Sequence, residues 1–75
     1  MPELRVGSVV QSISGHDRGF FAVVKIDSSF AYLADGRSRL LDKPKKKNPK
    51  HLRVTNTVID PMRMETNKKL KQALW

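Results

Sequence analysis

FFAVVKID, residues 20–27, carries the clearest structural signal in this 75-residue chain. Successive side chains of a strand point to opposite faces, so apolar residues at every second position indicate a strand with one face in the core. Here one side of the extended chain is wholly apolar and the other is mixed. The apolar side holds Phe20, Ala22, Val24 and Ile26, and the mixed side holds Phe21, Val23, Lys25 and Asp27. We therefore expect residues 20, 22, 24 and 26 to face the core.

The flanking segments also have strand character. Residues 6–14 are rich in β-branched side chains, and residues 30–34 form a second short apolar run. Asp35-Gly36 comes directly after that run and is typical of a two-residue hairpin turn, because both residue types tolerate positive φ. Residues 37–41 are accordingly predicted to be the return strand. Residues 51–59 alternate again and predict a fifth strand.

Two prolines bracket the segment between the last two predicted strands. Pro44 and Pro49 cannot donate to a ladder and the lysines between them repel, so residues 42–50 are predicted to be an exposed, extended loop. The tail from Thr66 to Trp75 is predicted to be a short helix, capped by Thr66 or Asn67. Its apolar residues are at helical spacing, and they are Leu70, Ala73 and Leu74. We expect one all-β unit over residues 4–59, a small five-stranded barrel, with a helical tail over 60–75 packed on it.

Positive charge is concentrated in the second half of the chain. Residues 37–53 read RSRLLDKPKKKNPKHLR and hold eight Lys or Arg residues and one acid, which gives +7 of the chain's net +8. Residues 1–35 have a net charge of −1 and residues 36–75 a net charge of +9. This asymmetry points to a polyanionic partner, nucleic acid above all, although solubility alone remains an alternative.

Other classes of protein are disfavoured. The chain has no cysteine, so neither a disulfide nor a cysteine-based zinc site is expected, and two separated histidines do not suggest a metal site. No apolar run approaches a membrane span and the N-terminus does not resemble a secretory signal, so a cytoplasmic protein is expected. Five of the seven acids are in predicted turns and the serines have no evident base partner. We expect no enzymatic activity and no cofactor.

The order of residues from Gly7 to Arg37 resembles the KOW motif, a strand–loop–strand unit of ribosomal proteins and transcription elongation factors. Gly7, Val9 and Val10 resemble the opening of the single KOW domain in eukaryotic and archaeal large-subunit ribosomal proteins, and Ala34-Asp35-Gly36 its end. Gly19 stands at the motif's characteristic glycine, and residues 44–57 resemble the segment after the motif in short bacterial RNA-binding proteins. The resemblance covers about residues 5–58. It implies an SH3-like barrel that binds RNA, often ribosomal RNA.

The candidate RNA-binding residues fall into two predicted loops and three predicted strands. The resemblance points to the loop before Gly19, where Asp17 offsets Arg18, so phosphate binding is expected mainly from residues 43–53. Lysine gives affinity without fixed geometry, and arginine can bind phosphate with two hydrogen bonds. Phe21 is the preferred base-stacking ring because its strand side also carries Lys25, whereas Phe30 is expected in the core and Tyr32 is a further candidate. The full set is His16, Arg18, Gly19, Phe21, Arg37, Arg39, Lys43, Lys45, Lys46, Lys47, Lys50, His51 and Arg53.

The expected function is therefore RNA binding, with ribosomal RNA as the partner and ribosomal or transcription proteins as further partners. The alternative is a protein-interaction module of the translation or transcription machinery. Trp75, at the end of the predicted helix, is then either an exposed anchor for a partner or, as we prefer, buried against the barrel. Duplex DNA binding ranks third, because the sequence has no recognition helix of the usual kind. Oligomeric state stays open.

Overall fold

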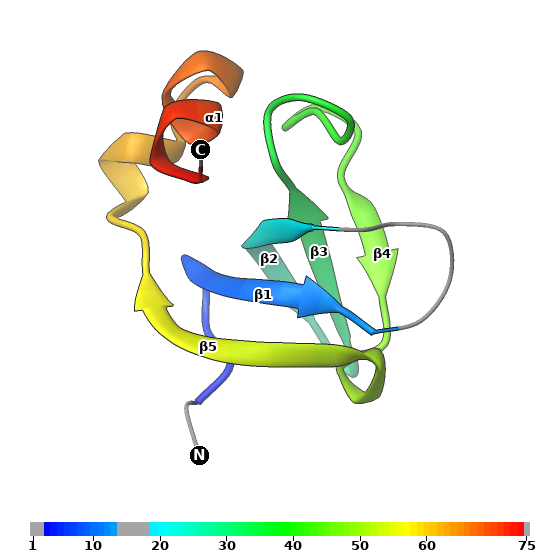
Figure 1. Ribbon diagram of the computed structural model, residues 1–75. Coiled ribbons are helices and arrows are strands. Elements are labelled where there is room, and N and C mark those ends of the chain that lie inside the picture. The colour runs from blue at the N-terminus through cyan, green and yellow to red at the C-terminus, as the bar shows by residue number, and fades with distance from the viewer. Residues whose placement is uncertain (1–2, 14–18, 75) are drawn as a thin grey trace.

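The computed structural model describes residues 3–13 and 19–74. Within them the protein is mostly β, with five antiparallel strands in one sheet and a short helix after them (Figure 1). The strands lie in the order β4-β3-β2-β1-β5. Their bounds are β1 Ser8–Ser12, β2 Phe20–Asp27, β3 Phe30–Ala34, β4 Lys45–Lys47 and β5 Leu52–Val58. Two 3-10 turns, η1 (Pro49–His51) and η2 (Pro61–Met64), precede β5 and helix α1 (Asn67–Leu74). None of the described helices is long and apolar enough to cross a membrane.

The sheet is strongly curved, as Figure 1 shows. In a flat sheet β4 and β5 would be separated by four interstrand gaps of about 4.8 Å, roughly 19 Å in all. Yet the chain passes directly from β4 to β5 through residues 48–51. That link, tightened by a 3-10 turn of about 2 Å rise per residue, spans on the order of 13 Å. The sheet must therefore curl to bring its edges toward each other, but no ladder joins β4 to β5 in the described residues, so it is not closed.

The middle of the sheet is buried on both faces. One core cluster consists of Val10, Phe21, Val23, Ala31, Leu33 and Leu52. The other brings α1 against the opposite face and consists of Val9, Ala22, Ala34, Ile59 and Leu70. The expected orientation of β2 was therefore only partly right: Ala22 is buried and Val24 packs against the second cluster, but the two ends of the strand differ. Phe21 is only 2% exposed, whereas Phe20 and Ile26, expected in the core, are 44% and 41% exposed. Alternation cannot distinguish the two sides of a strand that is covered on both.

The predicted hairpin at Asp35-Gly36 was also wrong. The two-residue turn is Ser28-Ser29, between β2 and β3, and Ser28 adopts a φ of 50°. Residues 37–41 form a loop, and the strand that returns along β3 is β4, the lysine run predicted to be a loop. A buried carboxylate explains the difference. Asp35 accepts hydrogen bonds from the backbone N–H groups of Arg37 (2.9 Å) and Arg39 (2.8 Å) and from the Ser38 hydroxyl (2.8 Å), which holds the chain in a loop.

Helix α1 holds this loop from the other side. The backbone N–H of Leu41 donates to the side-chain oxygen of Asn67, the first residue of α1, at 2.8 Å. Gly36 has a φ of 76°, and a Cβ there would collide with the backbone carbonyl of Asn67. Only glycine permits so close an approach of loop and helix. The β3–β4 connection is thus shaped by contacts that no local turn rule includes.

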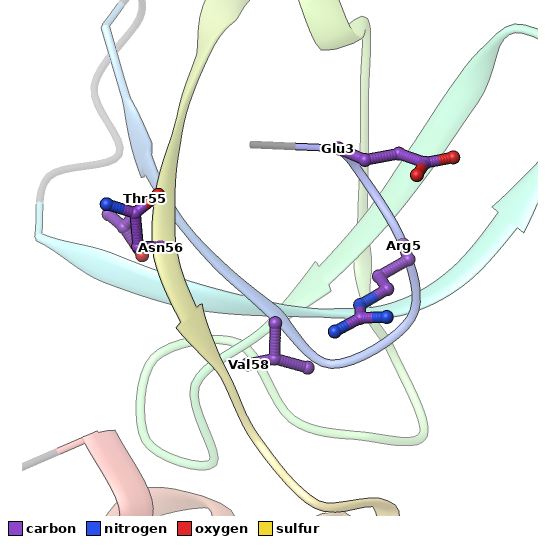
Figure 2. Close-up of a pocket in the computed structure, with 5 residues that line it drawn as sticks. All are labelled: Glu3, Arg5, Thr55, Asn56 and Val58. Carbon is purple, nitrogen blue, oxygen red and sulfur yellow. The ribbon is translucent and has the colours of Figure 1, made fainter. Parts of the chain in front are cut away.

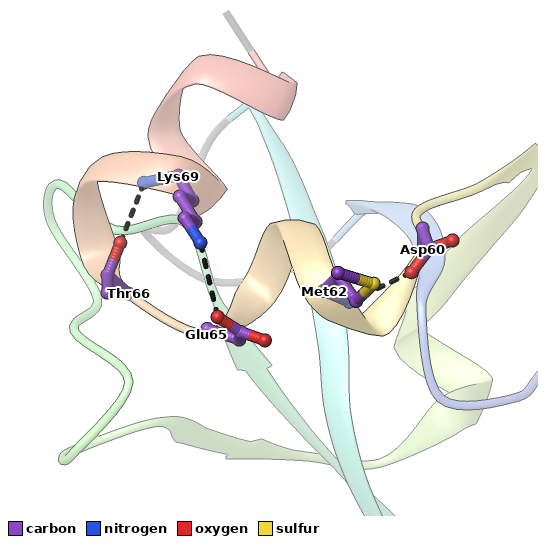
Figure 3. Close-up of polar contacts among 5 residues, drawn as sticks. All are labelled: Asp60, Met62, Glu65, Thr66 and Lys69. Atoms are coloured by element: carbon purple, nitrogen blue, oxygen red, sulfur yellow. Dashed lines mark hydrogen bonds and ion pairs between the residues drawn. The ribbon is translucent and has the colours of Figure 1, made fainter.

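The C-terminal segment begins with two side-chain caps (Figure 3). At the start of η2, the carboxylate of Asp60 accepts a hydrogen bond from the backbone N–H of Met62 at 2.9 Å. At the start of α1, the hydroxyl of Thr66 accepts one from the backbone N–H of Lys69 at 3.1 Å. The Lys69 ammonium also pairs with Glu65 at 3.1 Å. Of the two predicted caps, Thr66 and Asn67, the structure shows Thr66 in this role. The prediction of a helix with Leu70 facing inward is confirmed, since Leu70 has no exposed surface.

Candidate nucleic-acid interface

Two aromatic rings lie side by side on β3. Phe30 and Tyr32 are two residues apart, so they share one face of the strand, and we call them the ring pair. Ala34 continues the same face and is covered by α1 through Leu70. Farther along β3, away from α1, Phe30 and Tyr32 are half-buried residues.

A lysine from each neighbouring strand lies over the ring pair. Tyr32 pairs with Lys25 on β2 and with Lys46 on β4, and paired residues point to the same face. The Lys46 ammonium is 4.3 Å from the centroid of the Phe30 ring, and the Lys25 ammonium is 5.5 Å from that of Tyr32. Both distances are within the range of a cation–π contact. The surface therefore combines π faces with mobile positive charge.

Lys25 reaches this surface because of a β-bulge. The β2–β3 register runs from Val23↔Leu33 directly to Lys25↔Tyr32, so Val24 is the extra residue. In a regular ladder Val24 would lie beside Tyr32 and Lys25 would point to the other face. The bulge therefore places the basic Lys25, and not the apolar Val24, beside the Tyr32 ring. A carboxylate borders the same face, since Asp27 pairs with Phe30 and is exposed.

The three lysines of β4 are not equivalent. Lys45 and Lys47 pair with Leu33 and Ala31 and point to the face opposite the ring pair, where both are half-buried. Lys46 alone of the three points to the ring-pair face, and it is exposed.

The remaining basic candidates surround this strand or lie farther away. Arg37 and Arg39 belong to the β3–β4 loop, the first exposed and the second half-buried. Lys43, Lys50 and His51 are exposed on either side of β4. Arg53 is exposed on β5, where it pairs with Gln11 of β1. The basic run is thus distributed over a loop and both edge strands.

The loop candidates before β2 are only partly described. His16 and Arg18 lie outside the described residues. Gly19 has a φ of 92°, a conformation that favours glycine, immediately before β2. The structure contradicts the choice of Phe21 as the preferred stacking ring, because Phe21 belongs to the core and presents no face to a ligand. Phe30, expected in the core, takes its place at the surface.

Asp35 fixes the loop that carries the two arginines. Burial raises the pKa of its carboxyl, but hydrogen bonds from the backbone of Arg39 and Arg37 and from Ser38 outweigh burial and hold that pKa below its ordinary value. Asp35 is only 3% exposed. The carboxylate is therefore charged near neutral pH and works as a structural anion within a basic segment.

A separate pocket of about 300 Å³ lies between the N-terminal segment and β5 (Figure 2). Its lining consists of Glu3, Arg5, Thr55, Asn56 and Val58. Thr55 stabilises the irregular part of β5 by donating to the carbonyl of Val9 at 2.7 Å. The lining consists of one acid, one base, two neutral polar residues and one apolar residue, and it contains none of the candidates named from the sequence.

Sequence reasoning did not name Lys25 among the candidates, and it preferred Phe21, which is buried, to Phe30. The spacing of Phe30 and Tyr32 was a usable signal, because aromatic residues two apart in a strand share a face. The bulge that brings Lys25 beside them has no such signal, since it interrupts the alternation on which the prediction depended.

Comparison with known proteins adds no family assignment. No protein-family model matches the chain, and no curated protein matches its sequence. The resemblance of residues 5–58 to the KOW motif therefore stays a prediction, and function must be inferred from the residues of this surface and their arrangement.

Proposed function

We propose that this protein binds RNA through the face formed by β2, β3 and β4. One observation carries the proposal: the ring pair lies at the surface with Lys25 and Lys46 over it. Proteins that bind single strands combine positive charge for the backbone with aromatic side chains for the bases. The face offers both within one sheet.

The charge distribution supports a polyanionic ligand. Residues 36–75 have a net charge of +9, and an exposed lysine can neutralise phosphate without fixed geometry. Lys43, Lys46 and Lys50 are exposed on or next to β4. Such lysines give affinity and place the protein on the RNA backbone, while they carry little sequence information.

The fold supports a more specific proposal. Five antiparallel strands in a strongly curved sheet are compatible with the SH3-like barrel that the KOW resemblance implies. On that basis we propose structured RNA, ribosomal RNA first, as the ligand. Ultraviolet crosslinking in the source cells, with sequencing of the attached RNA, tests this: reads from one ribosomal RNA region support it, and scattered reads contradict it.

Paired lysine variants test the binding face itself. Lys25→Ala with Lys46→Ala removes two charges from the ring-pair face, and Lys68→Ala with Lys69→Ala removes two exposed charges from α1. Binding of a labelled RNA hairpin is measured by fluorescence anisotropy over a range of salt concentrations. Each phosphate of an unpaired region that is no longer neutralised should make the negative slope of log affinity against log salt concentration less steep by roughly 0.7.

The Lys25 and Lys46 pair should make this negative slope shallower by about 1.4 and weaken binding, whereas the control pair should leave slope and affinity nearly unchanged. Equal losses in the two pairs would show that net charge alone matters and would contradict the proposed face. If the unmodified protein did not bind RNA at low salt, the proposal would be wrong, and a protein partner with mild salt dependence would become the better interpretation.

A further inference from the structure

The geometry of the ring pair indicates which part of an RNA this face can hold. Phe30 and Tyr32 are two residues apart on a strand, so their attachment points are separated by about 6.6 Å. Stacked bases within one nucleic-acid strand are only about 3.4 Å apart. Two neighbouring bases can therefore each cover one ring only when they are not stacked on each other.

Base pairing would also prevent this contact. In a duplex the faces of the bases lie within the stack, and an A-form helix offers side chains mainly its phosphates, 2′-hydroxyls and a shallow groove. The half-buried rings of Phe30 and Tyr32 lie on the surface of the sheet and do not project as a wedge into a stack. They fit bases that are already unpaired.

The two lysines have a second role in this arrangement. In the free protein Lys46 and Lys25 occupy ring faces at 4.3 Å and 5.5 Å from the centroids. A base that stacks on a ring needs the same face, so the ammonium groups must move aside. Long, flexible side chains on the two strands that flank β3 can then reach the phosphates of the nucleotides that replaced them.

We propose that the ring pair binds two consecutive unpaired nucleotides of RNA, one base on Phe30 and one on Tyr32. Lys46 and Lys25 then exchange their ring contacts for phosphate contacts. This inference rests on the proposed RNA-binding function and narrows its ligand to an unpaired segment. Asp27, which pairs with Phe30, repels phosphate and so directs the backbone toward the lysine side of the ring.

Single-ring variants test the inference. Phe30→Leu and Tyr32→Leu keep an apolar side chain but remove the π face, and Phe20→Leu makes the same change at an exposed ring outside the pair. Each is measured against an unstructured single-stranded RNA and against a blunt RNA duplex by fluorescence anisotropy. The ring-pair variants should bind the single strand about tenfold more weakly, the loss expected for one stacked base, and the duplex unchanged.

Phe20→Leu should bind both RNAs like the unmodified protein. Equal losses for the single strand and the duplex, or no loss in either ring-pair variant, would overturn the inference while leaving RNA binding intact. Absence of any RNA binding by the unmodified protein would overturn the proposed function together with the inference. The three outcomes are therefore distinguishable.

A measurement without substitutions covers the case in which a variant fails to fold. Bases stacked on the rings should shift the ring-proton resonances of Phe30 and Tyr32 upfield in the unmodified protein. The shift should accompany addition of single-stranded RNA and not of duplex. Ring resonances that stay in place while the lysine resonances move would show phosphate binding alone and overturn the stacking arrangement.

Discussion

Replacing Asp35 should destabilise the protein more than its position in a loop suggests. The Asp35→Ala variant leaves three donors without their acceptor: the backbone N–H groups of Arg37 and Arg39 and the hydroxyl of Ser38. Removing a hydrogen bond to a charged group in a buried site costs about 1.5–3 kcal/mol. Arg39 is half-buried, whereas Arg37 and Ser38 are exposed and water can satisfy them in part. Counting the bond from Arg39 in full and discounting the other two gives a loss of about 3 kcal/mol.

A graded set of variants isolates the cause. Asp35→Asn keeps one oxygen for the two backbone donors but loses the charge and the bond from Ser38, so about half of the loss is expected. Asp42→Ala removes an exposed carboxylate from the same connection and should change stability by less than about 0.5 kcal/mol. Urea denaturation monitored by far-ultraviolet circular dichroism gives the free energy of unfolding. If Asp35→Ala unfolded at the same urea concentration as Asp42→Ala, the carboxylate would not be the group that holds the loop.

The same carboxylate gives a pH dependence of known sign. Its pKa is lower in the folded protein than its ordinary value, so folding favours the charged form. The stabilisation is present in full above the unfolded-state pKa, near 3.9, and is lost as the pH falls through the lower folded-state value. The stability difference between the unmodified protein and Asp35→Ala should therefore shrink once the pH drops below about 4. A difference that did not change with pH would refute the electrostatic explanation.

Three further outcomes can be checked. Gly36→Ala should lower the free energy of unfolding by about 2 kcal/mol or more, because the positive φ strains an L-residue and the new methyl group meets the Asn67 carbonyl. Thermal melting measures this loss, and an unchanged melting temperature would contradict the close contact. Leu70→Ala should lower the free energy of unfolding, measured by urea denaturation, by about 2–4 kcal/mol, since Leu70 is fully buried against the sheet. A loss below about 1 kcal/mol would mean that α1 contributes little to stability. If about four phosphates are neutralised, RNA binding should weaken about 50-fold from about 50 to 200 mM salt, and a slope near zero would contradict the electrostatic account.

Local patterns predicted those strands well whose own sequence carries a periodic signal, including β5, whose partner β1 is distant in the sequence. Residues 20–27 and 30–34 have the predicted bounds, residues 52–58 form a strand within the predicted 51–59, and the helix occupies 67–74 within the predicted 66–75. Each of these segments contains its own signal, either alternation or helical spacing. The elements could therefore be found without knowledge of their partners.

The misplaced elements depend on contacts that the strand and hairpin patterns do not include, some of them between distant residues. Asp35-Gly36 fits a hairpin turn locally, but the buried carboxylate and the link from Leu41 to Asn67 hold a loop there. The lysine run is a strand because β3 offers it an edge, although its own composition favours a loop. The candidate site was also only partly predictable. The basic segment was evident from composition, but the bulge at Val24 and the burial of Phe21 were not.

The position of the lysine strand also has a consequence for self-association. β4 is an edge strand of an open sheet, and such an edge is a template on which a second copy can pair. Two β4 strands side by side would bring six lysines together, and their mutual repulsion would oppose such pairing. A bound polyanion would neutralise that repulsion. Because Lys46 points to one face and Lys45 and Lys47 to the other, a ligand on the ring pair can bind the first while the other two continue to protect the edge.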